Sequence, residues 1–172
     1  YFFAKTVLKK LNIKGVFFIV TDLIKFNKNK KKKLIIKNIF PEINFSINPK
    51  YNAMSWNDVR KLEKMGHIIG SHTKSHIRLS DIKSLASLRE QIVSPINTFK
   101  KNKLRKPIFF AYSFGNFHSF NKKCFDIAIS RYKFIFSGIR GDNSKIKKIM
   151  FRDNIEDNYS LKTINFFISG YS

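Results

Sequence analysis

The sequence predicts an α/β fold in which helices cover a parallel sheet. Short apolar runs alternate with segments of helical apolar spacing, at roughly 30 to 40 residues per unit. The apolar runs are continuous, as expected for strands that are covered on both faces. This pattern fits both an open doubly wound sheet and a closed barrel.

The first predicted unit is a helix followed by a strand. Residues 3–11 predict the end of an amphipathic helix whose apolar face consists of Phe3, Val7, Leu8 and Leu11. The run 16–20, Val-Phe-Phe-Ile-Val, predicts a buried strand. We expect residues 21–53 to form a long irregular connection, punctuated by Pro41 and Pro49.

The second unit begins at Ser55, which with Asp58 predicts a capped helix start. The helix has an apolar stripe of Trp56, Val59, Leu62 and Met65. Gly66 is expected to end it, and Ile68-Ile69 predicts a short strand. We then expect Ser80 to begin a longer helix that Pro95 kinks or stops. Its predicted inward residues are Ile82, Leu85, Leu88, Ile92 and Phe99.

The remaining predicted elements alternate in the same way. Strands are predicted at 107–112, 133–137 and 148–152. A helix capped by Ser119 and extending to about Arg131 separates the first two, with Cys124 on its apolar face. A last helix is expected after the cap residue Ser160, with Leu161, Ile164 and Phe167 facing inward.

Composition restricts the class of protein without identifying its function. The chain of 172 residues with 43% hydrophobic residues fits one globular domain. No apolar run approaches the roughly 18 to 20 residues of a membrane span. A single cysteine, Cys124, excludes an internal disulfide and leaves the compartment undecided between cell envelope and cytoplasm.

The formal charge of +23 has two explanations. Such a charge attracts polyanions non-specifically at low salt, and the basic block 27–33 could act as a polyanion-binding arm. However, the basic residues are scattered among abundant Asn, Ile and Phe, whose codons are all A/T-rich. A biased genome therefore explains the excess without any ligand.

The most informative stretch runs from Gly66 to Ser80 and contains His72 and His76. Neutral imidazole is a common metal ligand, and an i, i+4 pair can bring two rings to one ion. Alone, such a pair is more often two surface histidines. Here the pair follows a predicted strand that ends at Gly70-Ser71, and sites on α/β scaffolds gather at such strand ends. No Glu follows His72, which excludes the His-Glu-x-x-His protease motif.

This stretch resembles the second motif of the polysaccharide deacetylases, the NodB-homology group or carbohydrate esterase family 4. The matching positions read Gly66-His67-x-Ile69-Gly70-Ser71-His72-Thr73-x-x-His76-x-x-Leu79-Ser80. Segments 8–18, 54–56 and 110–115 also fall where that family has similar sequence. The resemblance spans about residues 1–152. It implies a distorted (β/α) barrel with a metal at its C-terminal mouth and a single such domain over residues 1–172.

The resemblance also implies roles for individual residues. Family members use a divalent metal, which we expect to be zinc, to remove acetyl groups from N-acetylated sugars of cell-envelope polysaccharides. Two histidines and one aspartate bind the metal, and an adjacent aspartate is the base. His72 and His76 match the two histidines, and Thr73 matches the small hydroxyl residue beside the first.

Four further residues are candidates for binding substrate by the same resemblance. The backbone N–H of Phe114 would hold the oxyanion, and Gly115 completes that motif. The rings of Tyr112 and Phe114 would stack on a sugar, or else belong to the core. Arg152 would orient substrate or a carboxylate, or else be a surface or ion-paired residue. We expect His67 to be structural and His118 to lie in a surface loop.

The chain departs from the family pattern at the catalytic carboxylates. The Thr-Phe-Asp-Asp motif of the first strand is absent, and neither Asp22 nor Asp58 stands in a matching context. We therefore assign no catalytic base within the chain and expect the base aspartate upstream of Tyr1. Ser113 replaces a proline of the third motif, Ile68 replaces a common Glu, and no Leu-x-His motif supplies a general acid.

These departures limit the activity that we expect. The chain is either a fragment that lacks its first strand and its Asp-Asp motif or a degenerate relative. In both cases two histidines alone should bind a metal weakly, and hydrolysis without the base should be slow or absent.

A binding module is the alternative function. A basic α/β protein could grip nucleic acid or an anionic glycan through Lys28 to Lys33 and other lysines. Metal dependence separates the two hypotheses. Replacement of His72 would abolish deacetylation, whereas salt-sensitive polyanion binding would not change.

Overall fold

The computed structural model describes residues 1, 3–25, 35–39, 54–145, 148–155 and 158–169. Its centre is a five-stranded parallel sheet in the order β1-β2-β3-β4-β5, with every neighbouring pair parallel. The strands are β1 (Val16–Ile19), β2 (Ile68–Ser71), β3 (Phe109–Ala111), β4 (Phe134–Phe136) and β5 (Ile149–Met150). This confirms the predicted α/β class and the incomplete, barrel-like parallel sheet.

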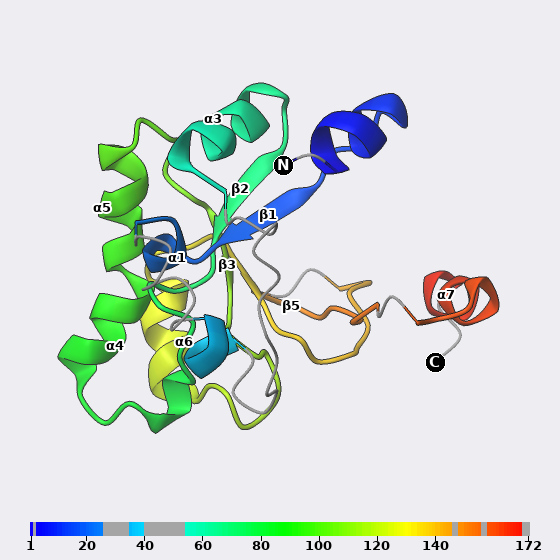
Figure 1. Ribbon diagram of the computed structural model, residues 1–172. Helices are drawn as coiled ribbons and strands as arrows, with labels where there is room; N and C mark the ends of the chain where they lie inside the picture. The colour runs from blue at the N-terminus through cyan, green and yellow to red at the C-terminus, as the bar shows by residue number, and fades with distance from the viewer. Residues whose placement is uncertain (2, 26–34, 40–53, 146–147, 156–157, 170–172) are drawn as a thin grey trace.

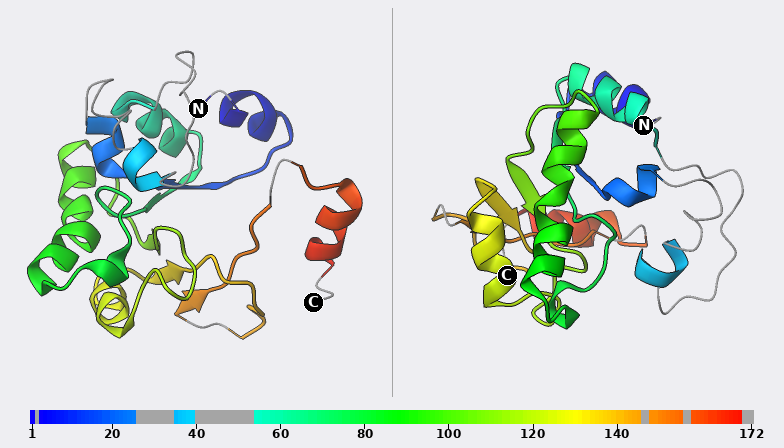
Figure 2. Two further views of the ribbon diagram at one scale, coloured as in Figure 1. Left: turned by 60° about the horizontal axis from the view of Figure 1, so that its bottom comes forward. Right: turned by 90° about the vertical axis from the view of Figure 1, so that its left-hand side faces the viewer.

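Helices connect the strands and cover one face of the sheet (Figures 1 and 2). The helical segments are η1 (Ala4–Leu8), α1 (Thr21–Lys25), η2 (Ile35–Ile39), α3 (Trp56–Lys64), η3 (Leu79–Asp81), α4 (Leu85–Ile92), α5 (Ser94–Lys101), α6 (Lys122–Ile129) and α7 (Leu161–Ile168). Of these, α3, α4, α5 and α6 form the covering layer, whereas α7 lies apart from the sheet in Figure 1 and in the left view of Figure 2. No helix among the described residues is long and apolar enough to cross a bilayer.

Two apolar clusters hold the helices against the sheet. The first lies under α3 and α5 and contains Ala4, Ile19, Val59, Leu62, Ile69, Phe99 and Leu104. The second lies under α4 and α6 and contains Leu79, Leu88, Ile92, Phe110, Tyr112, Cys124, Ala128, Tyr132 and Ile135. The buried position predicted for Cys124 is confirmed.

The predicted boundaries of α3 are confirmed in detail. Ser55 Oγ accepts a hydrogen bond from the Asp58 backbone N–H, and the Asp58 carboxylate accepts one from the Ser55 N–H. This reciprocal capping box satisfies two N–H groups that a helix start leaves open. At the other end Gly66 has a φ of +85°, which a glycine adopts without strain.

Two helix starts differ from the prediction. The helix expected from Ser80 begins instead after Ser84, whose Oγ accepts from Ser87 N–H, and Pro95 lies in the first turn of a separate helix, α5. The helix expected from Ser119 begins after Asn121, whose side chain accepts from Cys124 N–H.

Some residues of the predicted apolar faces are exposed instead. In and around η1, Phe3, Val7 and Leu11 are exposed, whereas Leu8 packs against the core as predicted, beside the buried Ala4. This segment is π-helical, so its side chains do not follow the α-helical spacing.

The two leucines that open α4 and α7 point into solvent. Leu85 and Leu161 are both exposed, although each was predicted to face inward. The predicted irregular connection 21–53 contains the helical segments α1 and η2. Its proline positions and the basic block 27–33 lie outside the described residues.

Candidate functional site

His72 and His76 lie together at the carboxyl end of β2. The strand ends at Ser71, and the backbone N–H of His72 still donates to the carbonyl of Ile19 at the end of β1. The two imidazole ring centroids are 4.8 Å apart, with the ring planes at 77°. The site therefore stands where two neighbouring parallel strands end.

Both rings are oriented by backbone carbonyls through the same nitrogen. His72 Nδ1 is 2.9 Å from the carbonyl oxygen of Ala111, and His76 Nδ1 is 2.9 Å from that of Asn38. Because a carbonyl oxygen only accepts, each Nδ1 carries the proton. Each Nε2 then has a free lone pair, and this is the arrangement typical of metal-ligating histidines.

Burial keeps both imidazoles neutral at ordinary pH. Desolvation is the main cause that lowers the pKa of His72 to about 4; the hydrogen bond to Ala111 opposes this shift, and the nearby His76 and Arg152 contribute to it. Burial likewise lowers the pKa of His76. The neutral imidazole is the form that can act as a ligand.

The loop between the histidines is held by Thr73. Its side chain is fully buried, and Oγ1 accepts from the His76 backbone N–H at 3.0 Å. The same hydroxyl is hydrogen-bonded to Ser113 Oγ at 3.1 Å. Thr73 and His76 both have positive φ values, 66° and 56°. These bonds stabilise a backbone conformation that non-glycine residues seldom adopt.

Helix α4 fixes the outer side of this loop. The Gln91 side chain oxygen accepts from the backbone N–H of Ser75 at 3.1 Å, and the Gln91 carbonyl accepts from the Lys74 N–H at 3.0 Å. On the opposite side, Asn38 Nδ2 donates to the Ser75 carbonyl at 2.7 Å. Three separate segments therefore hold the histidine loop.

A tight turn after β3 brings Phe114 to the histidines. The Phe114 ring packs edge-on against His76 with centroids 5.0 Å apart. Phe114 and Gly115 have φ values of 63° and 74°. A Cβ on Gly115 would lie 2.4 Å from the backbone nitrogen of Gly138, so only glycine fits this position.

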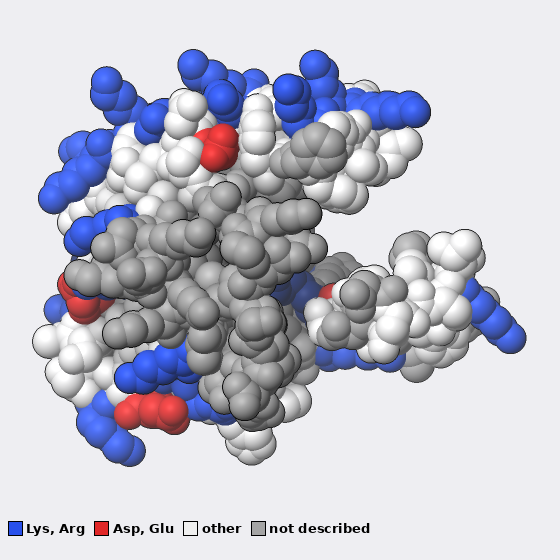
Figure 3. Space-filling model, in the orientation of Figure 1, with Lys and Arg blue, Asp and Glu red and all other residues white. Residues whose placement is uncertain are grey.

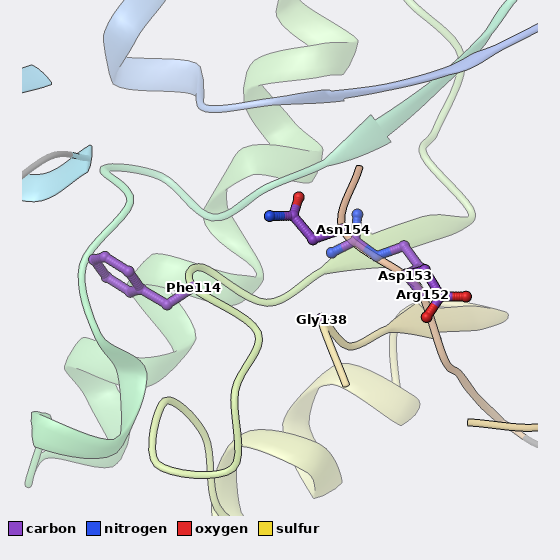
Figure 4. Close-up of a pocket in the computed structure, with 5 residues that line it drawn as sticks. All are labelled: Phe114, Gly138, Arg152, Asp153 and Asn154. Atoms are coloured by element: carbon purple, nitrogen blue, oxygen red, sulfur yellow. The ribbon is translucent and has the colours of Figure 1, made fainter. Parts of the chain in front are cut away.

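Arg152 lies on the other side of the site. A hollow of about 290 Å³ is lined by Phe114, Gly138, Arg152, Asp153 and Asn154 (Figure 4). Figure 4 shows Phe114 on one side of Gly138 and Arg152 on the other. Arg152 Nε donates to the Ser137 carbonyl at 2.6 Å, and burial lowers the pKa of its guanidinium. The half-buried cation therefore faces a cavity next to the histidines.

Tyr112 is a core residue and does not line the site. Its side chain is 1% exposed and stacks on Phe120 with a centroid distance of 4.1 Å. Burial raises the pKa of its hydroxyl. Its ring has no open face for a sugar, so of the two roles considered for Tyr112 the structure has the core role.

The two other histidines lie apart from this pair. His67 is buried and its Nδ1 accepts from the Gly15 N–H at 3.1 Å, which agrees with a structural role. His118 is exposed, as predicted, in the loop before α6.

Tyr1 has a structural position apart from the histidine pair. Its half-buried side chain packs against the apolar cluster under α3 and α5, and Lys61 Nζ lies 5.5 Å from its ring centroid. Its carbonyl accepts from the Lys5 backbone N–H at 3.0 Å, at the start of η1. Tyr1 therefore contributes nothing to the site itself, and the base aspartate expected upstream of Tyr1 stays a prediction.

The described residues supply two ligands for a metal and no third. They contain no group of three His, Cys, Asp or Glu side chains that could hold an ion. The charges that act on the buried Asp22 carboxyl belong to Lys74, Lys25 and Glu90, and Asp58 is engaged in the helix cap. Two neutral imidazoles with free Nε2 atoms fit a metal such as zinc, but as an incomplete set.

Sequence patterns missed the residues that orient the rings. The partners of the two Nδ1 atoms are backbone carbonyls of Asn38 and Ala111, and a backbone carbonyl has no side-chain signature. Gln91 was also missed. Its polar side chain next to an inward-facing Ile92 was the one available signal.

Comparison with known proteins identifies one family and several solved structures with the same fold. The model of the polysaccharide deacetylase family matches residues 4–129. No curated protein sequence matches the chain.

Three solved structures share its fold. A de-N-acetylase from Aggregatibacter actinomycetemcomitans has a TM-score of 0.71 and 18% identity, covering 97% of this chain and 70% of that one. The Streptococcus pyogenes deacetylase PplD, in complex with acetate, has a TM-score of 0.72 and 17% identity, and the match covers 96% of this chain and 63% of that one. IcaB from Ammonifex degensii has a TM-score of 0.64 and 16% identity, and the match covers 91% of this chain and 63% of that one. The chain therefore spans 63 to 70% of the length of these structures.

Proposed function

Because the chain belongs to the polysaccharide deacetylase family, we propose that it carries the histidine half of a metal-dependent site that removes acetyl groups from N-acetylated sugars. The substrate in this proposal is an oligo- or polysaccharide of the cell envelope, and residues 1–172 form part of one deacetylase domain. Two of the compared structures are a de-N-acetylase and a deacetylase with bound acetate, the product of such a reaction.

The pair of free Nε2 atoms carries this proposal. His72 and His76 would hold a divalent metal, zinc in our proposal, through these atoms. A bound metal of this kind polarises the amide carbonyl and lowers the pKa of a bound water. The protein's own contribution is to keep both rings neutral, close together and fixed by the carbonyls of Ala111 and Asn38.

Neighbouring residues would position the sugar. The turn at Phe114 and Gly115 lies beside the histidines, where the Phe114 N–H could donate to the developing oxyanion. Arg152 would bind substrate or orient a carboxylate from the hollow that it lines. Thr73 would act indirectly, because its buried hydroxyl fixes the His76 backbone.

Hydrolysis also needs a carboxylate to take the proton from the attacking water. The described residues place no such group beside the two rings. We propose that the base and the third metal ligand are an aspartate pair encoded upstream of Tyr1. The chain alone should therefore bind zinc weakly and release acetate slowly or not at all.

Acetate release from N-acetylglucosamine oligomers tests this proposal. We expect near-background release by the 172-residue chain, and zinc-dependent release by a chain extended with upstream coding sequence that contains an Asp-Asp pair. His72→Ala should abolish release by the extended chain, and His118→Ala should leave it unchanged. Equal release by the His72→Ala variant would contradict the proposed role of the histidines.

A further inference from the structure

The segments that lead into four of the five strands, β1 to β4, carry an unusual concentration of positive charge. In a parallel sheet, these segments all meet at the end opposite to the carboxyl ends of the strands. They are residues 9–15, 61–67, 100–108 and 130–133, which precede β1, β2, β3 and β4. The histidine pair lies at the other end of the sheet.

Every charged side chain in these four segments is Lys or Arg, apart from Glu63. All of the basic residues are exposed, and they are Lys9, Lys10, Lys14, Lys61, Lys64, Lys100, Lys101, Lys103, Arg105, Lys106, Arg131 and Lys133. We call this set the basic end. Figure 3 shows Lys and Arg side chains gathered along the upper edge, over η1, α3 and α5.

Hydrogen bonds join the four segments into one surface. Lys14 Nζ donates to the Met65 carbonyl at 2.9 Å, which links the first segment to the second. The backbone N–H of Arg105 donates to Glu63 Oε1 at 3.1 Å, which links the second segment to the third. This bond also engages Glu63, the one acidic residue of the four segments. The Lys133 N–H donates to the Ile108 carbonyl at 2.9 Å and links the third to the fourth.

Helix ends explain only part of this charge. Lysines in the last turns of α3 and α5 interact favourably with the exposed carbonyls there. The basic residues at 9–14, 103–106 and 131–133 lie beyond those last turns. The opposite end of the sheet is mixed in sign, with acidic residues in the segments that leave the strands, namely Asp22, Asp81, Asp142 and Asp153.

The composition of the basic end favours a fluid anionic surface over a shaped ligand. Lysine predominates, and it acts as a flexible point charge, whereas arginine is the usual residue for fixed, bidentate phosphate contacts. Leu11 and Ile13 are 59% and 48% exposed between Lys10 and Lys14. Aliphatic side chains among lysines suit the headgroup and acyl boundary of a membrane, and they gain nothing from a nucleic acid backbone.

We propose that the basic end binds the anionic phospholipid headgroups of a membrane surface, with Leu11 and Ile13 entering the interface. The domain would lie on the bilayer with its histidine end directed away from it. This inference does not depend on the deacetylase proposal, because none of its residues belongs to the histidine site.

Vesicle flotation with the 172-residue chain tests the proposal. We expect binding to vesicles with about 30% phosphatidylglycerol and not to pure phosphatidylcholine, with loss between about 50 mM and about 300 mM salt. The double variant Lys64→Glu/Lys101→Glu should bind the phosphatidylglycerol vesicles at least about tenfold more weakly than the wild type. The control Lys83→Glu/Lys123→Glu makes the same change in net charge at the other end of the sheet and should have a much smaller effect. Circular dichroism checks that each variant is folded.

A second pair of variants separates a membrane from other polyanions. Leu11→Ser/Ile13→Ser should weaken vesicle binding severalfold and leave binding to a duplex oligonucleotide and to heparin unchanged. Equal losses for the two lysine pairs would overturn the proposal, because binding would then follow net charge alone. An unchanged vesicle affinity in the Leu11/Ile13 variant would also overturn it, in favour of a general polyanion surface.

Discussion

Two imidazoles in the same tautomer are the residue-scale basis of the proposed site. The Nδ1 atoms of His72 and His76 are both used by backbone carbonyls, so both Nε2 atoms are left for a ligand. Sequence spacing identified the pair, but it could not show the tautomers or the ring separation. Those depend on Asn38 and Ala111, which are 38 and 39 positions away in the chain.

Burial of His72 predicts a pH-dependent stability in metal-free protein. The pKa of His72 is about 4 in the fold, against about 6.5 for an unfolded chain. The unfolded state therefore takes up a proton first, so the free energy of unfolding is full above about pH 6.5 and falls toward pH 4. The loss from this one group is up to about 3 kcal/mol.

Urea unfolding in the presence of a chelator at about pH 7 and about pH 5 measures this effect. His72→Gln cannot take up a proton, so its free energy of unfolding should fall less between the two pH values. His118→Gln, at an exposed position, serves as the control and should behave as wild type. The same pH dependence in all three proteins would contradict the assigned cause.

Thr73 supports the site through a single hydroxyl group. Thr73→Val keeps the shape of the side chain but leaves the buried His76 N–H without its partner. We expect a loss of about 1–3 kcal/mol in the free energy of unfolding and weaker zinc binding. Thr73→Ser keeps the hydroxyl and is the matched control. Chemical denaturation and calorimetry measure the two quantities, and full zinc affinity in Thr73→Val would show that the hydroxyl does not position His76.

At the element scale, the strands and most helices follow directly from their apolar patterns, while their starts depend on tertiary contacts. Ser80 and Ser84 are equally good cap residues in sequence. In the structure Ser80 Oγ donates to the His118 carbonyl at 2.6 Å, so that hydroxyl is used elsewhere and Ser84 caps α4. Ser119 likewise donates to the Asn116 carbonyl, and Asn121 caps α6.

The capping box of α3 gives a prediction at this scale. Ser55→Ala removes the side chain that accepts from the Asp58 N–H and should lower the free energy of unfolding by about 1 kcal/mol. Asn57→Ala, at an exposed position of the same helix turn, should change it by no more than about 0.5 kcal/mol. Thermal and urea unfolding measure the change in the free energy of unfolding for each variant. An equal change in Ser55→Ala and Asn57→Ala would mean that the cap contributes nothing.

At the scale of the whole molecule, the site depends on segments distant in the chain. The end of β2 carries the histidines, and the end of β3 and the segment η2 supply their carbonyl partners. Alternating apolar strands and helices predicted this parallel arrangement. They could not predict that Tyr112 packs under Phe120, because two aromatic residues near a strand end fit a core or a sugar platform equally well.

The two ends of the sheet therefore have separate chemistry. One end holds two neutral, largely buried imidazoles, and the other presents exposed cations on helix ends and loops. In an α/β fold, residues at the two ends can change independently, because the sheet and its covering helices separate them. Because of this separation, we expect substitutions at the histidine site to change zinc binding and substitutions at the basic end to change vesicle binding.

Zinc titration of the 172-residue chain by isothermal calorimetry tests the central claim most directly. We predict one weak site, with an affinity that His72→Ala and His76→Ala each reduce beyond detection and that His118→Ala leaves unchanged. The result that would contradict the account is zinc binding of wild-type affinity in His72→Ala, because the ion would then not lie between the two rings at the end of β2.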